Sequence, residues 1–184
     1  MAHVIAGMTQ SLDGFIEDAA GSADALYTDL TSLHGTDYMQ SMIEETGAVL
    51  MGRRSFEMGD PDWYAGNYEF QVPIFVVTHE PPSAMPKQDD NLTFTFVTDG
   101  IESALEQAMK AAAGKAVLLA GGANIAQQYL AARRIDEINL ALVPLLLRSG
   151  ARLFDNLGEA ELGLEQVRAI DAPGVTHLKY RGLK

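Results

Sequence analysis

Short apolar runs alternate with amphipathic segments along this chain, which is the pattern of an α/β protein. Strands joined through helices imply a mostly parallel sheet that is covered by helices on both faces. Buried strands are predicted over Val4–Met8, Ala48–Met51, Ile74–Thr78, Leu92–Val97, Ala116–Ala120 and Glu137–Val143. Helices are predicted over Asp37–Thr46 (capped by Thr36, ended by Gly47), behind a capping box of Asp99 and Glu102, and from about Ala123 to Ala132.

The last part of the chain follows a different pattern. Leu164–Ile170 and Val175–Arg181 flank the turn-forming residues 171–174 and predict an antiparallel pair of strands. The segment Met58–Gln71 is the longest irregular stretch and is expected to form a loop on the substrate side. No internal repeat, linker or low-complexity tract interrupts the pattern, so we expect one domain over residues 1–184.

Composition narrows the possible functions. The chain has no cysteine, which excludes disulfides and thiolate chemistry, and its four histidines (His3, His34, His79 and His177) lack metal-ligand spacing, so no metal is expected. A net charge of −12 disfavours nucleic-acid binding. No apolar run approaches the length of about 18 residues that a membrane span needs. The N-terminus shows no signal peptide, so a cytoplasmic protein is expected.

The candidate chemistry centres on Ala120-Gly121-Gly122-Ala123-Asn124. This stretch ends a predicted strand and opens a helix, which brings unpaired backbone N–H groups and the positive end of the helix together. Such a turn is an anion site, most often for a phosphate. Glycine also serves tight turns through its backbone freedom, so a simple strand–helix connection is the alternative.

A second turn of the same kind lies upstream, where Gly52-Arg53-Arg54-Ser55 follows an apolar run. The planar fork of arginine makes paired, charge-assisted bonds to phosphate. The chain holds only 13 Lys and Arg against 25 Asp and Glu, so two adjacent arginines at a strand's carboxyl end favour a phosphate site over scattered surface charge. Ligands of open α/β sheets gather at the carboxyl ends of the strands.

Taken in order, Val49–Glu57, Val76–His79 and Ala120–Ile125 resemble dihydrofolate reductase. The loop Ser11-Leu12-Asp13-Gly14 is similar to the reductase domain of the bifunctional riboflavin-biosynthesis deaminase/reductase and its stand-alone relatives. The resemblance extends from Val4 to about Tyr180. It implies a dihydrofolate reductase-like three-layer fold and an NADPH-dependent oxidoreductase that transfers hydride to a small heterocycle.

The resemblance also implies where the cofactor lies. Ala6 and Met8 would border the nicotinamide, and Thr78 and His79 the adenosine. Glu80 argues against a 2′-phosphate beside His79, so the choice of NADPH over NADH depends on the two arginines. A cis peptide bond is implied between the two glycines of the downstream turn. The residues expected to hold the phosphates are Gly52, Arg53, Arg54, Ser55, Gly121, Gly122, Ala123, Asn124 and Ile125.

On the substrate side, Asp13 is the candidate catalytic residue, because hydride transfer leaves negative charge that a positioned acid or an ordered water must meet with a proton. Turn formation by Asp13-Gly14 is the alternative. Asp37 lies close to the acidic position of folate reductases, but such a residue also suits the first turn of a helix. Trp63 and Tyr64 are expected to stack on the substrate or to anchor their loop.

Two departures bear on the substrate. The stretch Gln10–Ile16 replaces the tryptophan-bearing loop of folate reductases, which disfavours folate, and Ala120 stands where riboflavin-pathway reductases carry glutamate. The best named substrate is 5-amino-6-(5-phosphoribosylamino)uracil of riboflavin biosynthesis. A pterin or dihydrofolate-type reductase and a non-catalytic dinucleotide-binding protein are the alternatives, whereas a P-loop phosphotransferase is excluded by the lack of its motif.

The run Leu140–Leu147 holds more apolar surface than one strand face needs, and Pro144 suggests an edge or a bend. Relatives of this kind are commonly dimers. A homodimer through this run or the C-terminal strands is therefore expected, with a strand buried on both faces as the alternative.

Overall fold

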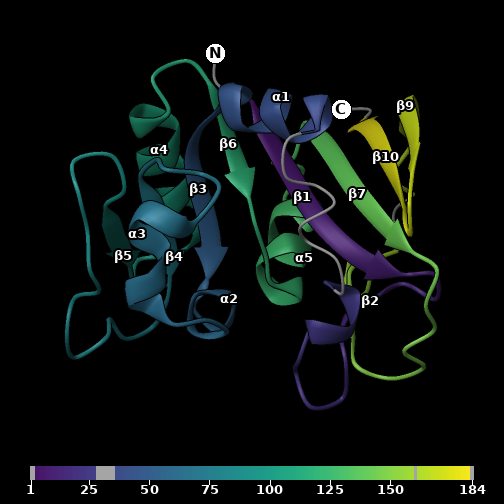
Figure 1. Cartoon of the computed structure of the whole chain (residues 1–184), viewed down its shortest axis with the longest axis horizontal. Helices are drawn as coiled ribbons and strands as arrows, with labels where there is room; N and C mark the ends of the chain where they lie inside the picture. Colours follow the sequence, from purple (N-terminus) through teal and green to yellow (C-terminus); the bar gives the residue numbers. More distant parts are fainter. Residues whose placement is uncertain (1–2, 28–35, 160, 183–184) are drawn as a thin grey trace.

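The computed structural model describes residues 3–27, 36–159 and 161–182. Figure 1 labels most of its elements. The helices are η1 (Asp24–Leu26), α1 (Asp37–Glu45), α2 (Arg53–Glu57), η3 (Pro61–Trp63), α3 (Tyr64–Asn67), α4 (Ile101–Ala111) and α5 (Ala123–Ala131). The strands are β1 (Val4–Ser11), β2 (Phe15–Glu17), β3 (Thr46–Gly52), β4 (Ile74–Val77), β5 (Phe94–Val97), β6 (Ala116–Leu119), β7 (Glu137–Val143), β8 (Ala151–Arg152), β9 (Leu164–Ala172) and β10 (Val175–Gly182).

An eight-stranded sheet in the order β5-β4-β3-β6-β1-β7-β10-β9 forms the centre of the fold. Its neighbouring strands from β5 to β7 run parallel, and β10 is antiparallel to both β7 and β9. The predicted fold class, a mostly parallel sheet with a C-terminal antiparallel pair, is confirmed. Because these strands run parallel, the carboxyl ends of β4, β3, β6 and β1 lie at one edge of the sheet.

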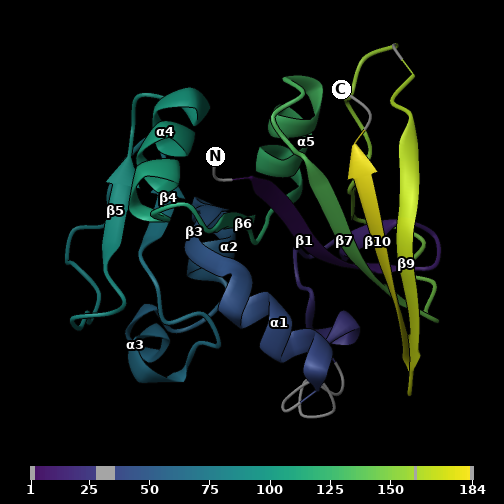
Figure 2. The ribbon, with the colours of Figure 1, turned by 90° about the horizontal axis from the view of Figure 1, so that it is seen from above.

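Helices cover both faces of the sheet, as Figure 2 shows with α1 and α3 on one side and α4 and α5 on the other. Two buried clusters fill the layers. The cluster under α4 and α5 includes Leu105, Ala108 and Tyr129, and the cluster under α1 and α3 includes Met42 and Tyr64. No helix in the described ranges is both long and apolar enough to cross a membrane.

The junction of α1 and β3 differs from the prediction. Helix α1 ends at Glu45, and the Thr46 hydroxyl donates to the carbonyl of Met42 at 2.7 Å as the chain enters the strand. Gly47 does not end the helix. A Cβ there would lie 2.5 Å from the Ala112 carbonyl oxygen, so this glycine allows the strand to approach the end of α4 closely.

The predicted capping box of α4 is wrong. Gly100 is the N-cap, with a φ of 106° that favours glycine, and no side chain caps the helix there. Asp99 therefore precedes the cap instead of forming it.

The segment Met58–Gln71 is not wholly a loop, because it contains the short helices η3 and α3. The Asp60 carboxylate starts η3 by accepting from the backbone of Asp62 at 3.0 Å. The strands β2 and β8 form a small second sheet that the sequence did not predict, since two or three residues are too few to show an alternating pattern.

Candidate functional site

The two glycine-containing turns meet at the carboxyl edge of the sheet. The turn after β3 and the turn after β6 lie on neighbouring strands, and the backbone N–H of Gly52 donates to the Gly121 carbonyl at 3.0 Å. A Cβ on Gly52 would lie 3.1 Å from Cγ1 of Ile125, which is the first buried residue of α5. The fold therefore joins the two candidate phosphate-binding segments into one surface.

Glycine is required at this junction because the Ser55 side chain approaches the backbone of the second turn closely. A Cβ on Gly121, whose φ is +112°, would lie 2.8 Å from the Ser55 hydroxyl oxygen, and one on Gly122 would lie 3.1 Å from it. The peptide bond between Gly121 and Gly122 is cis, as the resemblance implied. The two glycines leave the backbone of this turn bare of side chains, and Ser55 of α2 packs directly against it.

Helix α5 begins directly at this bare backbone. Gly122 is its N-cap, and no side chain caps the helix, so its first-turn N–H groups keep their capacity to donate to a ligand. The Asn124 side chain lies on the exposed side and accepts from Gln128 at 2.7 Å. The helix end provides backbone donors and a positive dipole for an anion.

Arg53 and Arg54 begin α2 at the same edge, and both side chains are exposed. Nε of Arg53 donates a hydrogen bond to the Glu57 carboxylate at 2.7 Å. Nη2 of Arg54 donates to the Glu17 carboxylate at 2.9 Å. The hydrogen bond and charge of Glu57 raise the pKa of the Arg53 guanidinium. Each guanidinium has five N–H donors, so one carboxylate contact leaves donors for a phosphate.

The adenosine-side candidates follow β4, next to the arginines. Thr78 is buried, and its hydroxyl donates to the Glu80 carbonyl at 2.7 Å and accepts from the Glu80 backbone at 3.2 Å. This hydroxyl forms a turn, and His79 is exposed beside it.

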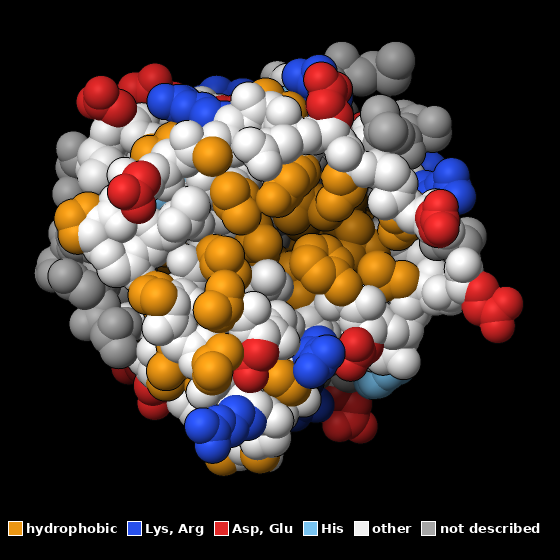
Figure 3. All heavy atoms as spheres, turned by 90° about the vertical axis from the view of Figure 1, so that its right-hand side faces the viewer, with side chains coloured by type: hydrophobic (Ala, Val, Ile, Leu, Met, Phe, Trp, Pro, Cys, Tyr) orange, Lys and Arg blue, Asp and Glu red, His pale blue; other side chains and the backbone are white. Residues whose placement is uncertain are grey.

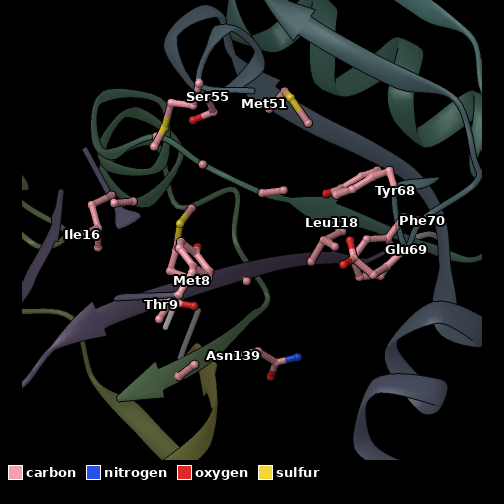
Figure 4. Close-up of a pocket in the computed structure, with 18 of the residues that line it drawn as sticks. Met8, Thr9, Ile16, Met51, Ser55, Tyr68, Glu69, Phe70, Leu118 and Asn139 are labelled. Carbon is pink, nitrogen blue, oxygen red and sulfur yellow. The ribbon is translucent and has the colours of Figure 1, made fainter. Parts of the chain in front are cut away.

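A pocket of about 430 Å³ opens next to the glycine junction. In Figure 4, Ser55 lies at one end of the pocket and Asn139 at the other, with Met8 between them. Predicted site residues that line it are Met8, Ser55, Trp63, Tyr64, Gly121 and Gly122. Apolar and aromatic side chains make up much of the rest of the wall, among them Ile16, Tyr27, Tyr38, Met39, Met42, Met51, Met58, Tyr68, Phe70 and Leu118.

The two aromatic candidates differ in their settings. Tyr64 is 9% exposed and packs edge-on against Phe94, with ring centroids 5.8 Å apart, which supports the anchoring role. Trp63 is 51% exposed, and its ring contacts Tyr64 edge-on with centroids 6.5 Å apart. Trp63 is thus half-exposed where it lines the pocket.

One wall of the pocket is polar, and sequence reasoning missed it. Asn139 and His177, on β7 and β10, are 3% and 5% exposed, and Tyr38 of α1 lies over the His177 ring at a centroid distance of 4.5 Å. Burial raises the pKa of Tyr38 to about 12 and lowers the pKa of His177, so both are neutral at pH 7. A lone asparagine inside the apolar run of β7 was the signal that could have pointed here.

Asp13 lies apart from the pocket lining. Its carboxylate accepts from the Ser11 hydroxyl at 2.6 Å and from the backbone N–H groups of Leu147 and Arg148 at 3.1 and 2.8 Å. The Ser11 hydrogen bond, aided by these two N–H groups, lowers the pKa of Asp13. A carboxylate so stabilised is a poor proton donor, which favours the turn-forming alternative for Asp13.

Two further predicted residues also lie away from the lining. Asp37 is exposed in the first turn of α1, where it suits the helix dipole, and the adjacent Tyr38 faces the pocket instead. Ala6 is 2% exposed and packs in the cluster beneath α5. In the described part of the chain no group of three or more acidic or histidine side chains could hold a metal, and His34 lies outside that part.

Comparison with known proteins agrees with this architecture. The chain is 29% identical to the uncharacterized protein YwjB of Bacillus subtilis over 156 residues, which are 84% of each chain. A crystal structure of a Shewanella sp. PV-4 protein with a proposed role in riboflavin biosynthesis matches with a TM-score of 0.77, 23% identity and full coverage of both chains. Dihydrofolate reductase from Enterococcus faecalis, complexed with NADP(H), matches with a TM-score of 0.64 and 14% identity, covering 99% of this chain and 97% of that one.

The two solved structures share the fold at low identity, and the suspected resemblance is confirmed by a family model. The model of the RibD C-terminal domain matches residues 2–176, nearly the whole chain. The chain belongs to the RibD C-terminal domain family.

Proposed function

We propose that the protein is an NADPH-dependent oxidoreductase that transfers hydride to a small heterocycle held in the apolar pocket. The observation that carries this proposal is the junction of Gly52, Ser55, Gly121 and Gly122, a bare backbone surface between an uncapped helix N-terminus and the pocket. The dihydrofolate reductase of the same fold was crystallised with NADP(H), which supports the choice of cofactor.

The residues present fit a dinucleotide. The first-turn N–H groups of α5 would bind the pyrophosphate, and a Cβ at either downstream glycine would occupy the space beside Ser55 that the cofactor needs. Arg53 and Arg54 would bind a phosphate with their remaining N–H groups, and Met8 would border the nicotinamide. When bound, NADPH supplies the hydride.

The pocket walls would bind and orient the substrate. The methionines and aromatic rings exclude water from a flat heterocycle, and the exposed face of Trp63 can stack on it. Because Asp13 is held in its turn by three hydrogen bonds, we assign the proton that completes the reduction to an ordered water. An ordered water is one of the two proton sources that the sequence left open, and Asp13 is the other.

The best named substrate is 5-amino-6-(5-phosphoribosylamino)uracil, supported by the family and by the proposed riboflavin role of the Shewanella protein. A pterin is the second candidate, because the pocket is apolar enough for any flat heterocycle. The test is NADPH oxidation, followed by absorbance, with a panel of aminopyrimidines and pterins. Oxidation with one class identifies it, whereas NADPH that binds but is never consumed would favour a non-catalytic dinucleotide-binding protein.

We also propose that the protein forms a homodimer through its C-terminal strands. Strand β9 ends the sheet and carries Leu164 and Val167 at 43% and 42% exposure. Figure 3 views the side of the molecule on which β9 and β10 lie and shows hydrophobic side chains gathered in a hollow there. An exposed apolar edge strand is a common surface for association.

A further inference from the structure

Two buried polar side chains that line the pocket carry atoms without hydrogen-bond partners. Oδ1 of Asn139 and both ring nitrogens of His177 have no partner among the described residues, although these residues are only 3% and 5% exposed. Native proteins leave few buried polar groups unpaired, since each unmade hydrogen bond is costly. The unpaired atoms lie in the wall of the pocket that the proposed substrate would fill.

The strand register brings the two side chains to the same face of the sheet. Asn139 pairs with Gly7 of β1, and His177 pairs with Ala141 of β7. Because Asn139 and Ala141 are two residues apart, their side chains share that face, and Asn139 and His177 are diagonal neighbours across the strand pair. Gly7 and Ala141, which face the polar pair across the strands, are small and also line the pocket.

Asn139 and His177 offer a defined set of hydrogen-bond donors and acceptors. Nδ2 of Asn139 already donates to the sulfur of Met42 at 3.0 Å, which leaves Oδ1 as an acceptor. A neutral imidazole offers one N–H donor and one acceptor, and burial keeps His177 neutral by lowering its pKa. Of the charged groups around this wall, Glu137 and Lys179 form an ion pair with each other at 2.7 Å, and Arg168 acts on Tyr38 with the opposite sign to Glu137. The polar wall is therefore uncharged.

We propose that Asn139 and His177 bind the lactam edge of the substrate heterocycle. The ring N–H of a –NH–C(=O)– unit donates to Oδ1 of Asn139, and its carbonyl accepts from the ring N–H of His177. The inference rests on the proposed reductase function and deepens it, because it limits the substrate to oxo-pyrimidines and oxo-pteridines with an unsubstituted lactam. The wall formed by Tyr38, Asn139 and His177 offers no carboxylate to a cationic diamino heterocycle. Two carboxylates stand in the rest of the lining, Glu17 and Glu69, and Glu17 is paired with Arg54 at 2.9 Å.

The test compares two fluorescent probes that differ only at this edge, lumazine and 1,3-dimethyllumazine, whose ring N–H groups are methylated. Each is titrated against the wild-type protein and against Asn139→Leu, which keeps the side-chain size but removes the acceptor. The matched control is Gln10→Met, since Gln10 is also a buried amide with an unpaired oxygen but lies outside the pocket lining. NADPH affinity is measured separately for each protein.

Wild type and Gln10→Met should prefer lumazine by about tenfold or more, as expected for one or two buried hydrogen bonds. Asn139→Leu should lower that preference to about twofold or less, and His177→Leu should do the same. An unchanged preference in both variants, or no preference in the wild-type protein, would overturn the lactam site. Lumazine binding without NADPH binding would contradict the reductase proposal while leaving this site standing.

Discussion

At the scale of single residues, His177 makes stability depend on pH. Burial lowers its pKa in the folded protein, so the unfolded chain takes up a proton first as the pH falls through about 6.5. The stabilising contribution of the neutral ring is therefore fully present above that pH and is lost below it. The ring faces Tyr38, and the nearby Glu137 and Lys179 neutralise each other.

Urea unfolding between about pH 5 and 7 checks this prediction, with a slope of at most about 1.4 kcal/mol per pH unit from one proton. His177→Gln should flatten the slope, and His79→Gln on the exposed surface is the control for the loss of a histidine. A slope that survives in His177→Gln would assign the effect to another group.

The variant Asp13→Asn tests whether Asp13 forms the turn or donates the proton in catalysis. The amide cannot accept all three hydrogen bonds that the carboxylate accepts, so we expect a lower melting temperature but a nearly unchanged kcat for NADPH oxidation. Thermal unfolding and steady-state kinetics on the same preparation supply both values. A kcat that falls more than about a hundredfold at unchanged stability would restore Asp13 as the proton donor.

Residue types grouped the cofactor-side candidates more readily than the polar wall of the pocket. Gly52, Arg53, Gly121 and Gly122 could be grouped from the sequence because each follows a predicted strand, and the structure places them at one edge. Asn139 could not be found in this way, because its significance depends on facing Gly7 across a strand pair and on having no partner for its oxygen.

At the scale of elements, the start of α2 is expected to determine cofactor affinity. Arg53→Ala combined with Arg54→Ala should weaken NADPH binding roughly 100-fold, about tenfold for each lost charge-assisted contact. A calorimetric titration measures the change. The matched control is Arg133→Ala with Arg134→Ala, an adjacent arginine pair that follows α5 away from the pocket lining. Equal affinities of the two double variants would rule out phosphate binding by α2.

Element boundaries were predicted where the local sequence pattern determines them. They were missed where tertiary contacts determine them. The strand Glu137–Val143 was predicted over its whole length from its apolar run. The end of α1 was not, because the Thr46 hydroxyl and the close approach of Gly47 to Ala112 decide it, and neither is visible in local sequence. The helices η3 and α3 escaped prediction because each is a single short turn.

At the scale of the whole molecule, the exposed edge of the sheet predicts a dimer. Light scattering at micromolar concentration should give the mass of two chains for the wild-type protein and of one chain for Val167→Lys, which places a charge on β9. Met85→Lys, at another residue that is 56% exposed, should leave the dimer intact. A monomeric wild-type protein, or a dimer in both variants, would contradict the proposed interface.

The central claim is that the bare glycine junction holds NADPH beside the pocket, and a binding titration of Gly122→Ala tests it most directly. The added Cβ would lie 3.1 Å from the Ser55 hydroxyl oxygen, a contact that a small rotation of Ser55 relieves, so the fold should persist while the cofactor's approach is blocked. Gly59→Ala is the control, because a Cβ there meets nothing within 4 Å. We predict micromolar NADPH binding by the wild-type protein and by Gly59→Ala, and a loss of at least about tenfold in Gly122→Ala. Equal NADPH affinity in all three folded proteins, or none in the wild-type protein, would contradict the account.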